Sequence, residues 1–307
     1  MKIAVLDDYQ DVVRTLDCFA LLEGHDVEVL PHGEPPADAE ALVLIRERTR
    51  VDAALLERVP RLRAISQTGR AGAHVDREAC EERGIAVLEE SGDPTASAEL
   101  TWALVLAASR RLPQYAERLR AGEWQRNGLE GTAGALGTVL RGRTLGILGY
   151  GRIGSLVAAY GEAFGMRVLA WGRERSRAAA RAAGHEVAAS QRELFAGADV
   201  VSLHLRLTDE TRGSVTAADL AAMRPAALLV NTARAGLVEP AALLAALDAG
   251  RPGFAALDVF ETEPLRAGEP LLRLPNVVAT PHLGYVERES YELYLGEAFR
   301  NLLDFAS

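Results

Sequence analysis

The chain has 307 residues, of which 49% are hydrophobic and 25% charged, and its formal net charge is −9. This length allows two domains with a substantial core, and the acidic balance argues against nucleic acid or an anionic membrane as a partner. The longest mostly apolar run, Leu100 to Ala108, is too short to span a bilayer.

The N-terminal residues and the two cysteines indicate the cell compartment. Met1 to Leu6 leads directly into a strand pattern, so we expect no signal peptide. Cys18 and Cys80 stand in no motif, which is typical of a reducing compartment and predicts neither disulfides nor a structural metal. We therefore expect a cytoplasmic protein without a metal site.

The first part of the chain, to about residue 97, predicts a parallel sheet covered by helices. Helical patterns lie at residues 13–22 and 51–58 and in a segment that ends at Gly84. Apolar runs bounded by loop residues predict five strands, at 2–6, 26–30, 41–45, 62–66 and 85–88. Continuous apolar strands that alternate with helices are typical of a parallel sheet buried on both faces.

The second part predicts another sheet of the same kind. A long apolar helix over 98–112 and a helical piece reaching Trp124 precede it. Six strands follow, at 145–148, 166–171, 199–203, 227–231, 254–259 and 276–280. The helical stretches are 155–164, 177–183, 217–223 and 240–249. This order predicts a doubly wound α/β sheet, whose ligands bind outside the carboxyl ends of its strands.

A closing helix over 289–305 is expected to return to the first unit. The first domain is therefore predicted to be discontinuous and to comprise residues 1–97 and 286–307. The second is predicted to comprise residues 98–285.

The most informative stretch is the turn after the first strand of the second part. Gly149, Gly151 and Gly154 form a G-x-G-x-x-G pattern between an apolar strand and an amphipathic helix. In a dinucleotide-binding turn, the first glycine permits the tight turn, the second lets a pyrophosphate approach the backbone, and the third lets the helix pack against the strand. The helix N-terminus then faces the phosphates with its N–H groups and positive dipole end.

Three later strands of the second part end in polar groups that can act together. Arg234, Glu263 and His282 follow the fourth, fifth and sixth strands, so we expect them to converge on one cleft. An arginine can hold a carboxylate and polarise a carbonyl, and a histidine can give or take a hydroxyl proton near neutral pH. A carboxylate beside the histidine favours its protonated form. With a nicotinamide, this set suits hydride transfer between a 2-keto acid and a 2-hydroxy acid.

The sequence resembles the D-isomer-specific 2-hydroxyacid dehydrogenase family over almost its whole length. The resemblance rests on an ordered set of motifs, namely LGILGYGRIG (145–154), VSLHLRLTDETRG (201–213), LLVNTARAGLVE (228–239), LDVFETEPL (257–265) and TPHLGY (280–285). It implies a flavodoxin-like substrate domain, a Rossmann dinucleotide-binding domain and an NAD(P)-dependent enzyme. One departure is Arg206, which stands where the family usually has a proline after the histidine at the strand end.

The resemblance also implies roles for individual residues. Arg234 matches the arginine that binds substrate, Glu263 the glutamate that supports the histidine, and His282 the acid/base. Asp258 matches the aspartate that holds the nicotinamide amide. The other positions implied to contact the cofactor are Arg152, Ile153, Gly172, His204, Thr211, Thr232, Ala233 and Gly284.

In the first part, the resemblance places a substrate loop at residues 68–71. Gly69, Arg70 and Ala71 belong to this loop, and the amides of Arg70 and Ala71 are expected to bind the substrate carboxylate. Arg46 follows a strand of the same part, so it is a further candidate for substrate contact, and two arginines there would suit a second anionic group. The resemblance also implies a homodimer through the segment 98–124.

The choice between NAD and NADP depends on the end of the second strand of the dinucleotide-binding domain. Enzymes that prefer NAD place an acidic residue there to bind the ribose hydroxyls. Here Gly172 and Arg173 come first, and Arg173 and Arg175 could pair with a 2′-phosphate, which favours NADP. Glu174 could still serve as the acidic partner, and both arginines could be solvated, because Lys2 is the only lysine and arginine is the default cation of this chain.

Two other interpretations remain open. A non-catalytic, dinucleotide-sensing interaction protein of the corepressor type belongs to the same family, but Arg234, Glu263 and His282 argue against it. Within the enzyme class, phosphoglycerate dehydrogenase is the nearest alternative, although such enzymes are usually longer and this chain leaves no room for a regulatory domain. Glu263 disfavours a formate-type dehydrogenase, which has an amide at that position. The residues do not identify the 2-hydroxy acid.

Overall fold

The computed structural model describes residues 1–132, 134–265 and 268–306. The chain forms two compact units, one comprising Met1–Asp93 and Tyr285–Ser307 and the other Pro94–Gly284. Residues 94–97 therefore belong to the second unit and Tyr285 to the first. Among the described residues, no helix combines the length and apolar character that crossing a membrane requires.

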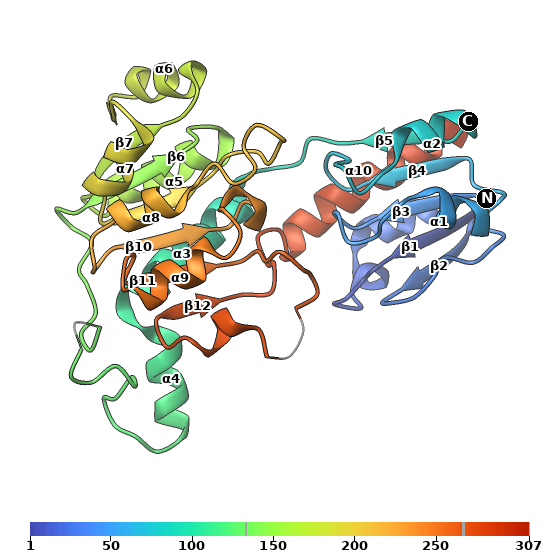
Figure 1. The fold of residues 1–307 in the computed structure, drawn as a ribbon. Coiled ribbons are helices and arrows are strands. Elements are labelled where there is room, and N and C mark those ends of the chain that lie inside the picture. The colour runs from blue at the N-terminus through green and yellow to red at the C-terminus, as the bar shows by residue number, and fades with distance from the viewer. Residues whose placement is uncertain (133, 266–267, 307) are drawn as a thin grey trace. The chain divides into compact units, whose positions relative to one another are not determined.

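The first unit is built on a parallel sheet with the strand order β2-β1-β3-β4-β5 (Figure 1). Its strands are β1 (Lys2–Leu6), β2 (Asp26–Leu30), β3 (Ala41–Leu44), β4 (Ala64–Gln67) and β5 (Ala86–Glu89). Its helical elements are η1 (Val13–Thr15), η2 (Asp17–Leu22), α1 (Ala53–Arg58), α2 (Arg77–Glu82) and α10 (Arg288–Ala306). This strand order is that of flavodoxin-like folds.

The alternation of side chains along the strands of the first unit explains its two apolar layers. Ile3 and Val5 of β1 pack with η1, η2 and α10 on one face of the sheet. Ala4 and Leu6 point to the other face and pack with α1 and α2. All four residues are at most 1% exposed, as expected for a parallel strand covered on both sides.

The second unit is built on a second parallel sheet with the strand order β12-β11-β10-β9-β6-β7-β8. Its strands are β6 (Thr144–Leu148), β7 (Arg167–Trp171), β8 (Glu186–Val187), β9 (Val200–Leu203), β10 (Leu228–Asn231), β11 (Phe254–Leu257) and β12 (Val277–Ala279). The chain runs from the centre at β6 to one edge and then returns through β9 to the other edge. This is the Rossmann arrangement, and its switch point lies between β6 and β9.

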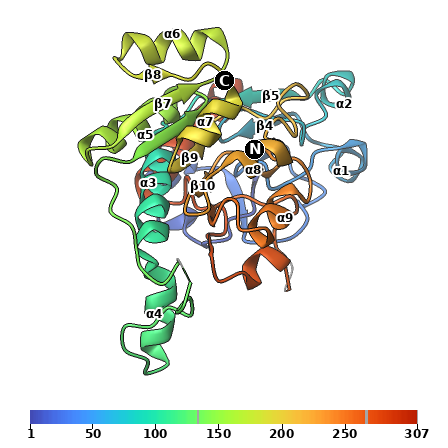
Figure 2. The ribbon, with the colours of Figure 1, turned by 60° about the vertical axis from the view of Figure 1, so that its left-hand side comes forward.

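Helices cover both faces of the second sheet (Figure 1). Their bounds are α3 (Thr95–Arg110), α4 (Leu112–Arg120), α5 (Arg152–Ala163), α6 (Glu174–Ala182), α7 (Gln191–Gly197), α8 (Ala217–Ala222), η3 (Ala235–Leu237), α9 (Ala242–Asp248) and η4 (Pro270–Arg273). Leu145 and Ile147 of β6 pack with α3 and α5, whereas Leu148 packs in the layer that contains α7, α8 and α9. In Figure 2, α4 extends from the end of α3 away from the second sheet.

The α/β fold class with two parallel-sheet domains is confirmed, but several predicted elements were wrong. The expected helix at 13–22 is two short 3₁₀ segments, η1 and η2, separated by Leu16 in an extended conformation. The sequence also did not predict β8, a two-residue edge strand, or α7. Helix α3 begins at Thr95 and ends where Arg111 adopts a left-handed conformation.

Candidate functional site

The three glycines of the turn after β6 meet three different constraints. Gly149 has a φ of +97°, and a Cβ there would lie 2.8 Å from the carbonyl carbon of His204. A Cβ on Gly154 would overlap the carbonyl oxygen of Gly149. By contrast, a Cβ on Gly151 would have no neighbour within 4 Å. The protein itself therefore requires glycine at 149 and 154 but leaves open space at 151, which fits the close approach of a ligand.

Helix α5 begins directly after this open position. Gly151 is its N-cap residue and makes no side-chain cap, so the first turn presents backbone N–H groups beginning with those of Arg152 and Ile153. Arg152 is exposed and Ile153 half-buried. A helix N-terminus of this kind favours a negatively charged group such as a pyrophosphate. The turn and the helix therefore fit a dinucleotide.

The end of β7 carries charges of both signs. Gly172 follows Trp171, and Arg173 forms an exposed ion pair with Glu210. Arg175 is exposed. Glu174 lies on α6 and is paired with Arg177 (2.6 Å) and with Arg181 (3.2 Å). The acidic residue of this segment is thus neutralised by its own helix, and Arg173 is held by a carboxylate from another loop.

The segment after β9 contains His204 and Thr211. Burial lowers the pKa of His204 to about 4, so its imidazole is neutral at pH 7, and its Nε2 lies 2.9 Å from the Ser202 hydroxyl. The Thr211 hydroxyl donates to the Arg206 carbonyl (2.6 Å) and accepts from the Thr208 amide (2.8 Å). Thr211 therefore shapes the turn at 206–211.

The turn after β10 presents Arg234. Asn231 is 2% exposed; its side-chain oxygen accepts from the Ala233 amide (3.1 Å), and its side-chain nitrogen donates to the Arg234 carbonyl (3.0 Å). The Thr232 hydroxyl lies 2.6 Å from that of Thr101 on α3. Arg234 Nη1 donates to the Ala233 carbonyl (2.7 Å). Asn231 and Thr101 fix this turn, although neither was predicted as a site residue from the sequence.

Glu263 and His282 form a direct pair. His282 Nδ1 lies 2.6 Å from Glu263 Oε2, and Glu263 Oε1 accepts from the Phe260 amide (2.8 Å). Burial raises the pKa of Glu263, but the bond with His282, the Phe260 amide and the charge of Arg234 together lower it below its ordinary value. Glu263 is therefore an anion at neutral pH, beside an imidazole whose side chain is 27% exposed. Such a pair can orient a histidine and stabilise its protonated form.

Asp258 determines the shape of the loop that carries His282. Its Oδ1 accepts from the Thr280 hydroxyl (2.6 Å) and the Leu283 amide (2.7 Å), and its Oδ2 accepts from the Gly284 amide (2.9 Å). Burial raises the pKa of Asp258, and these donors and His282 oppose that effect. His282 itself has a φ of +55°. In this structure the Asp258 carboxylate thus positions the loop, in addition to the cofactor contact that the resemblance implies.

The predicted substrate loop lies in the first unit, and two of its amides are hydrogen-bonded to carboxylates. The Gly69 amide donates to Glu90, and the Ala71 amide donates to Glu89 Oε1 (2.6 Å). The Ala71 amide, which we expect to bind the substrate carboxylate, thus donates to a carboxylate of the chain itself. Arg70 is exposed.

Arg46 and its neighbour Arg48 lie among tyrosine rings of the first unit. The Arg46 guanidinium lies 5.1 Å from the ring centroid of Tyr285, and that of Arg48 lies 4.2 Å from the ring centroid of Tyr9. Arg46 Nη1 also lies 3.5 Å from the Thr68 carbonyl, and its amide donates to the Thr68 hydroxyl (2.8 Å). Arg46 is therefore attached to Thr68, the first residue of the predicted substrate loop.

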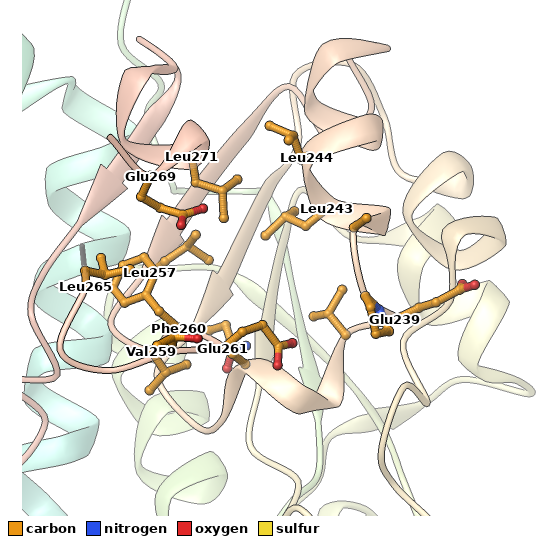
Figure 3. A pocket seen from close by; sticks show the side chains of 16 residues that line it. Glu239, Leu243, Leu244, Leu257, Val259, Phe260, Glu261, Leu265, Glu269 and Leu271 are labelled. Atoms are coloured by element: carbon orange, nitrogen blue, oxygen red, sulfur yellow. The ribbon is translucent and has the colours of Figure 1, made fainter. Parts of the chain in front are cut away.

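A cavity of about 220 Å³ lies in the second unit between α9, the end of β11 and residues of the segments 259–265 and 269–271 (Figure 3). Its lining is mainly apolar, with Leu243, Leu257 and Phe260 pointing into it and Glu261 and Glu269 among its polar members. Of the described residues that line it, none is Arg234, Glu263 or His282. The cavity is thus separate from the histidine–glutamate pair, although Phe260 contributes to both.

Comparison with known proteins agrees with this geometry. The family model for the D-isomer specific 2-hydroxyacid dehydrogenase, NAD binding domain, matches residues 102–284. A glyoxylate reductase of Aeropyrum pernix is 42% identical over 293 residues, covering 92% of this chain and 87% of the relative. A D-3-phosphoglycerate dehydrogenase of Methanocaldococcus jannaschii is 39% identical over 295 residues, covering 94% of this chain. The chain spans only 54% of the length of that relative.

Solved structures give the same result. The structure of a phosphoglycerate oxidoreductase from Vibrio cholerae o395 is 53% identical, has a TM-score of 0.94, and covers 100% of this chain and 99% of its own. The sequence motifs, the strand order and these relatives all indicate the same family. The chain belongs to the D-isomer-specific 2-hydroxyacid dehydrogenase family of nicotinamide-dependent oxidoreductases.

Proposed function

We propose that the chain interconverts a small 2-keto acid and the corresponding D-2-hydroxy acid with a nicotinamide dinucleotide. The observation that carries this proposal is the hydrogen bond between His282 and an ionised Glu263, next to the charge of Arg234. A nicotinamide dinucleotide held by Gly149, Gly151, Gly154 and the N-terminus of α5 supplies or accepts the hydride. The protein itself then has to bind and orient the substrate and to transfer a proton.

Four side chains share these tasks. Arg234 binds the substrate carboxylate and polarises the carbonyl through its guanidinium. In reduction, protonated His282 donates a proton to the carbonyl oxygen, and in oxidation the neutral ring accepts the hydroxyl proton. Glu263 holds the ring by Nδ1, so the other ring nitrogen, Nε2, exchanges the proton. Asp258 keeps the His282 loop in place through its bonds to Leu283 and Gly284.

For the cofactor, NADP is the preferred proposal. Arg173 and Arg175 stand at the end of β7, where an enzyme specific for NAD would place a carboxylate. The carboxylate of Glu174 is already paired with arginines of its own helix. The variant Arg173→Ala is expected to raise KM for NADPH roughly tenfold and leave KM for NADH within twofold. A matched control is Arg192→Ala, at an exposed position on α7.

A substrate with a second anionic group is the second candidate within this class. Arg46 and Arg48 follow β3, and relatives of this chain are named phosphoglycerate enzymes. Two guanidinium groups held against aromatic rings suit a phosphate or a second carboxylate. Phosphohydroxypyruvate would then have a lower KM than glyoxylate, and Arg48→Ala would remove that difference.

A homodimer through the segment 98–124 is also proposed. Leu112, Leu119 and Trp124 are 55%, 57% and 77% exposed, and α4 contains no buried residue. Exposed apolar side chains gathered on one segment are typical of a contact surface. Sedimentation equilibrium is expected to give twice the mass of the chain, and the double variant Leu119→Glu, Trp124→Glu should give the mass of one chain.

A substrate panel tests the central proposal. Purified protein is assayed with glyoxylate, hydroxypyruvate, pyruvate, phenylpyruvate and phosphohydroxypyruvate, each with NADH and with NADPH. We expect oxidation of at least one reduced dinucleotide with at least one keto acid, and the D-hydroxy acid as product. Protein that binds a dinucleotide but reduces none of these acids would contradict the proposal and would favour a non-catalytic role.

A further inference from the structure

Two carboxylates at the end of β5 bind the amides of the predicted substrate loop. Strands β4 and β5 pair in register, with Gln67 opposite Glu89, so the loop that leaves β4 lies beside Glu89 and Glu90. The Ala71 amide donates to Glu89 Oε1 (2.6 Å), and the Gly69 amide donates to Glu90. Arg70 within the loop and Arg77 at the start of α2 add positive charge. The loop thus presents an environment that accepts carboxylates, and the chain already supplies two of them.

The two carboxylates differ in how firmly they are held. Glu90 is 9% exposed, and its main-chain amide also donates to the Gly69 carbonyl (3.3 Å). Glu89 is more accessible, with a side chain 33% exposed, and it makes an ion pair with Arg77 Nη2 (2.6 Å). The same oxygen, Oε1, accepts from both Ala71 and Arg77. Glu89 can therefore lose its hydrogen bond to the Ala71 amide and keep its ion pair with Arg77. Glu90 has no exposed cation of this kind among its described contacts.

We propose that Glu89 competes with the substrate carboxylate for the Ala71 amide, and that Arg77 retains Glu89 when the substrate takes the amide. This inference rests on the proposed function, because it assumes that a keto acid binds the loop at 69–71. It makes Glu89 a residue that sets substrate affinity without taking part in the chemical step. The bond between the Glu89 carboxylate and the Ala71 amide also disfavours any ligand that lacks a carboxylate. Such a ligand cannot form a charge-assisted hydrogen bond in place of the one that Glu89 loses.

The variant Glu89→Gln separates competition from a structural role. Its carbonyl oxygen can still accept from the Ala71 amide, but a bond to a neutral acceptor is weaker than one to a carboxylate, and a negative charge near the incoming substrate disappears. If Glu89 competes, KM for the keto acid falls roughly fivefold, with kcat within twofold of the parent. If Glu89 only holds the loop in shape, KM rises.

Binding of oxamate, an unreactive carboxylate that resembles a keto acid, gives a readout independent of turnover. The Kd is measured by calorimetry on the whole protein with saturating NADPH, or NADH if that is the dinucleotide bound. Glu89→Gln is expected to lower the Kd roughly fivefold. The control Glu78→Gln removes the same charge from an exposed position on α2, beside Arg77 in sequence, and should leave the Kd within twofold.

A double-mutant cycle with Arg77 tests the second half of the proposal. In the parent, Arg77→Ala removes the partner that retains Glu89, so oxamate should bind at least threefold more weakly. In the Glu89→Gln background the same change should alter the Kd by less than twofold, since there is no carboxylate to retain. Equal effects of Arg77→Ala in both backgrounds would overturn the proposal, as would a Kd that rises in Glu89→Gln.

The outcomes distinguish this inference from the proposed function. Parent protein that binds oxamate but reduces no keto acid contradicts the proposed function, and the cycle still decides whether Glu89 competes. Parent protein that reduces keto acids with a KM unchanged or raised in Glu89→Gln contradicts only the competition. Protein that neither binds oxamate nor reduces a keto acid contradicts both.

Discussion

Nδ1 of His282 lies 2.6 Å from Oε2 of Glu263, and the second carboxylate oxygen of Glu263 accepts the Phe260 amide at 2.8 Å. Glu263 is therefore fixed at both oxygens and cannot turn away from the ring without losing a bond. The imidazole is thus held by its Nδ1 side, and Nε2 is the nitrogen that we propose exchanges the proton.

Replacing the histidine should separate chemistry from cofactor binding. His282→Ala removes the proposed proton donor and acceptor, so kcat should fall roughly 100- to 10,000-fold. The dinucleotide affinity should stay within twofold, because the glycine turn and α5 are untouched. Steady-state kinetics and fluorescence titration with NADPH measure the two quantities. Retention of more than a tenth of the parent kcat would exclude His282 as the acid/base.

The Glu263→Gln variant tests the electrostatic part of the pair. The pKa of Glu263 is lowered in the folded protein, so the parent keeps an anion beside the ring above acidic pH. Without this anion the protonated imidazole is less favoured. Reduction of the keto acid should therefore fall roughly tenfold at pH 8 and much less at pH 6, where the solution supplies protons more readily. A loss that is equal at both pH values would instead indicate that Glu263 acts only by positioning.

Two glycine variants in the same turn should fail in different ways. A methyl group on Gly154 would overlap the Gly149 carbonyl and lie 3.1 Å from Ile147, so Gly154→Ala should destabilise the protein by about 1–3 kcal/mol. The methyl group of Gly151→Ala would have no neighbour within 4 Å, so this variant should change the free energy of unfolding by less than about 0.5 kcal/mol. It should nevertheless weaken dinucleotide binding roughly tenfold, because a methyl group stands where the pyrophosphate approaches.

Denaturation curves and cofactor titrations on both glycine variants check this contrast. The parent protein serves as the control for folding, and Gly184→Ala is avoided as a control because Gly184 has a positive φ. Gly151→Ala that binds the dinucleotide as tightly as the parent would contradict the role of this position. An equally stable Gly154→Ala would show that the turn can relax.

The buried carboxyl of Glu90 should make stability depend on pH. Burial, together with Glu297, raises the pKa of Glu90 to about 7, whereas an unfolded chain has the ordinary value of about 4.5. Between these two values the folded protein keeps a proton that the unfolded chain has released, so the free energy of unfolding falls as the pH rises from about 4.5 to about 7. Glu90→Gln mimics the protonated acid, so its free energy of unfolding should not show this fall with pH.

Urea denaturation at pH 5 and pH 8 measures the effect. Relative to the parent, Glu90→Gln should gain up to about 3 kcal/mol of stability on going from pH 5 to pH 8. Glu78→Gln, on an exposed site, should show no such change. A relative stability of Glu90→Gln that is the same at both pH values would mean that Glu90 ionises as readily in the folded as in the unfolded chain.

Local patterns predicted most of the fold because each element carries its own signal. The apolar runs at 2–6 and 145–148 are short, continuous and bounded by loop residues, so β1 and β6 were expected within one residue of their bounds. The failures occurred where the signal is short or mixed. The two residues of β8 cannot display a periodicity, and the segment at 13–22 satisfies a helical pattern although Leu16 interrupts it.

The sequence by itself determined the fold class. It also predicted the dinucleotide turn and the candidates Arg234, Glu263 and His282, because glycine spacing and strand-end residues are local features. Only the tertiary structure decided what each carboxylate binds. Glu89 reaches the Ala71 amide across 18 residues because β4 and β5 are neighbours, and Asp258 reaches the Gly284 amide across 26 because β11 and β12 are. Strand order depends on how whole elements bury their apolar faces against one another, so it cannot be predicted from a short stretch of sequence.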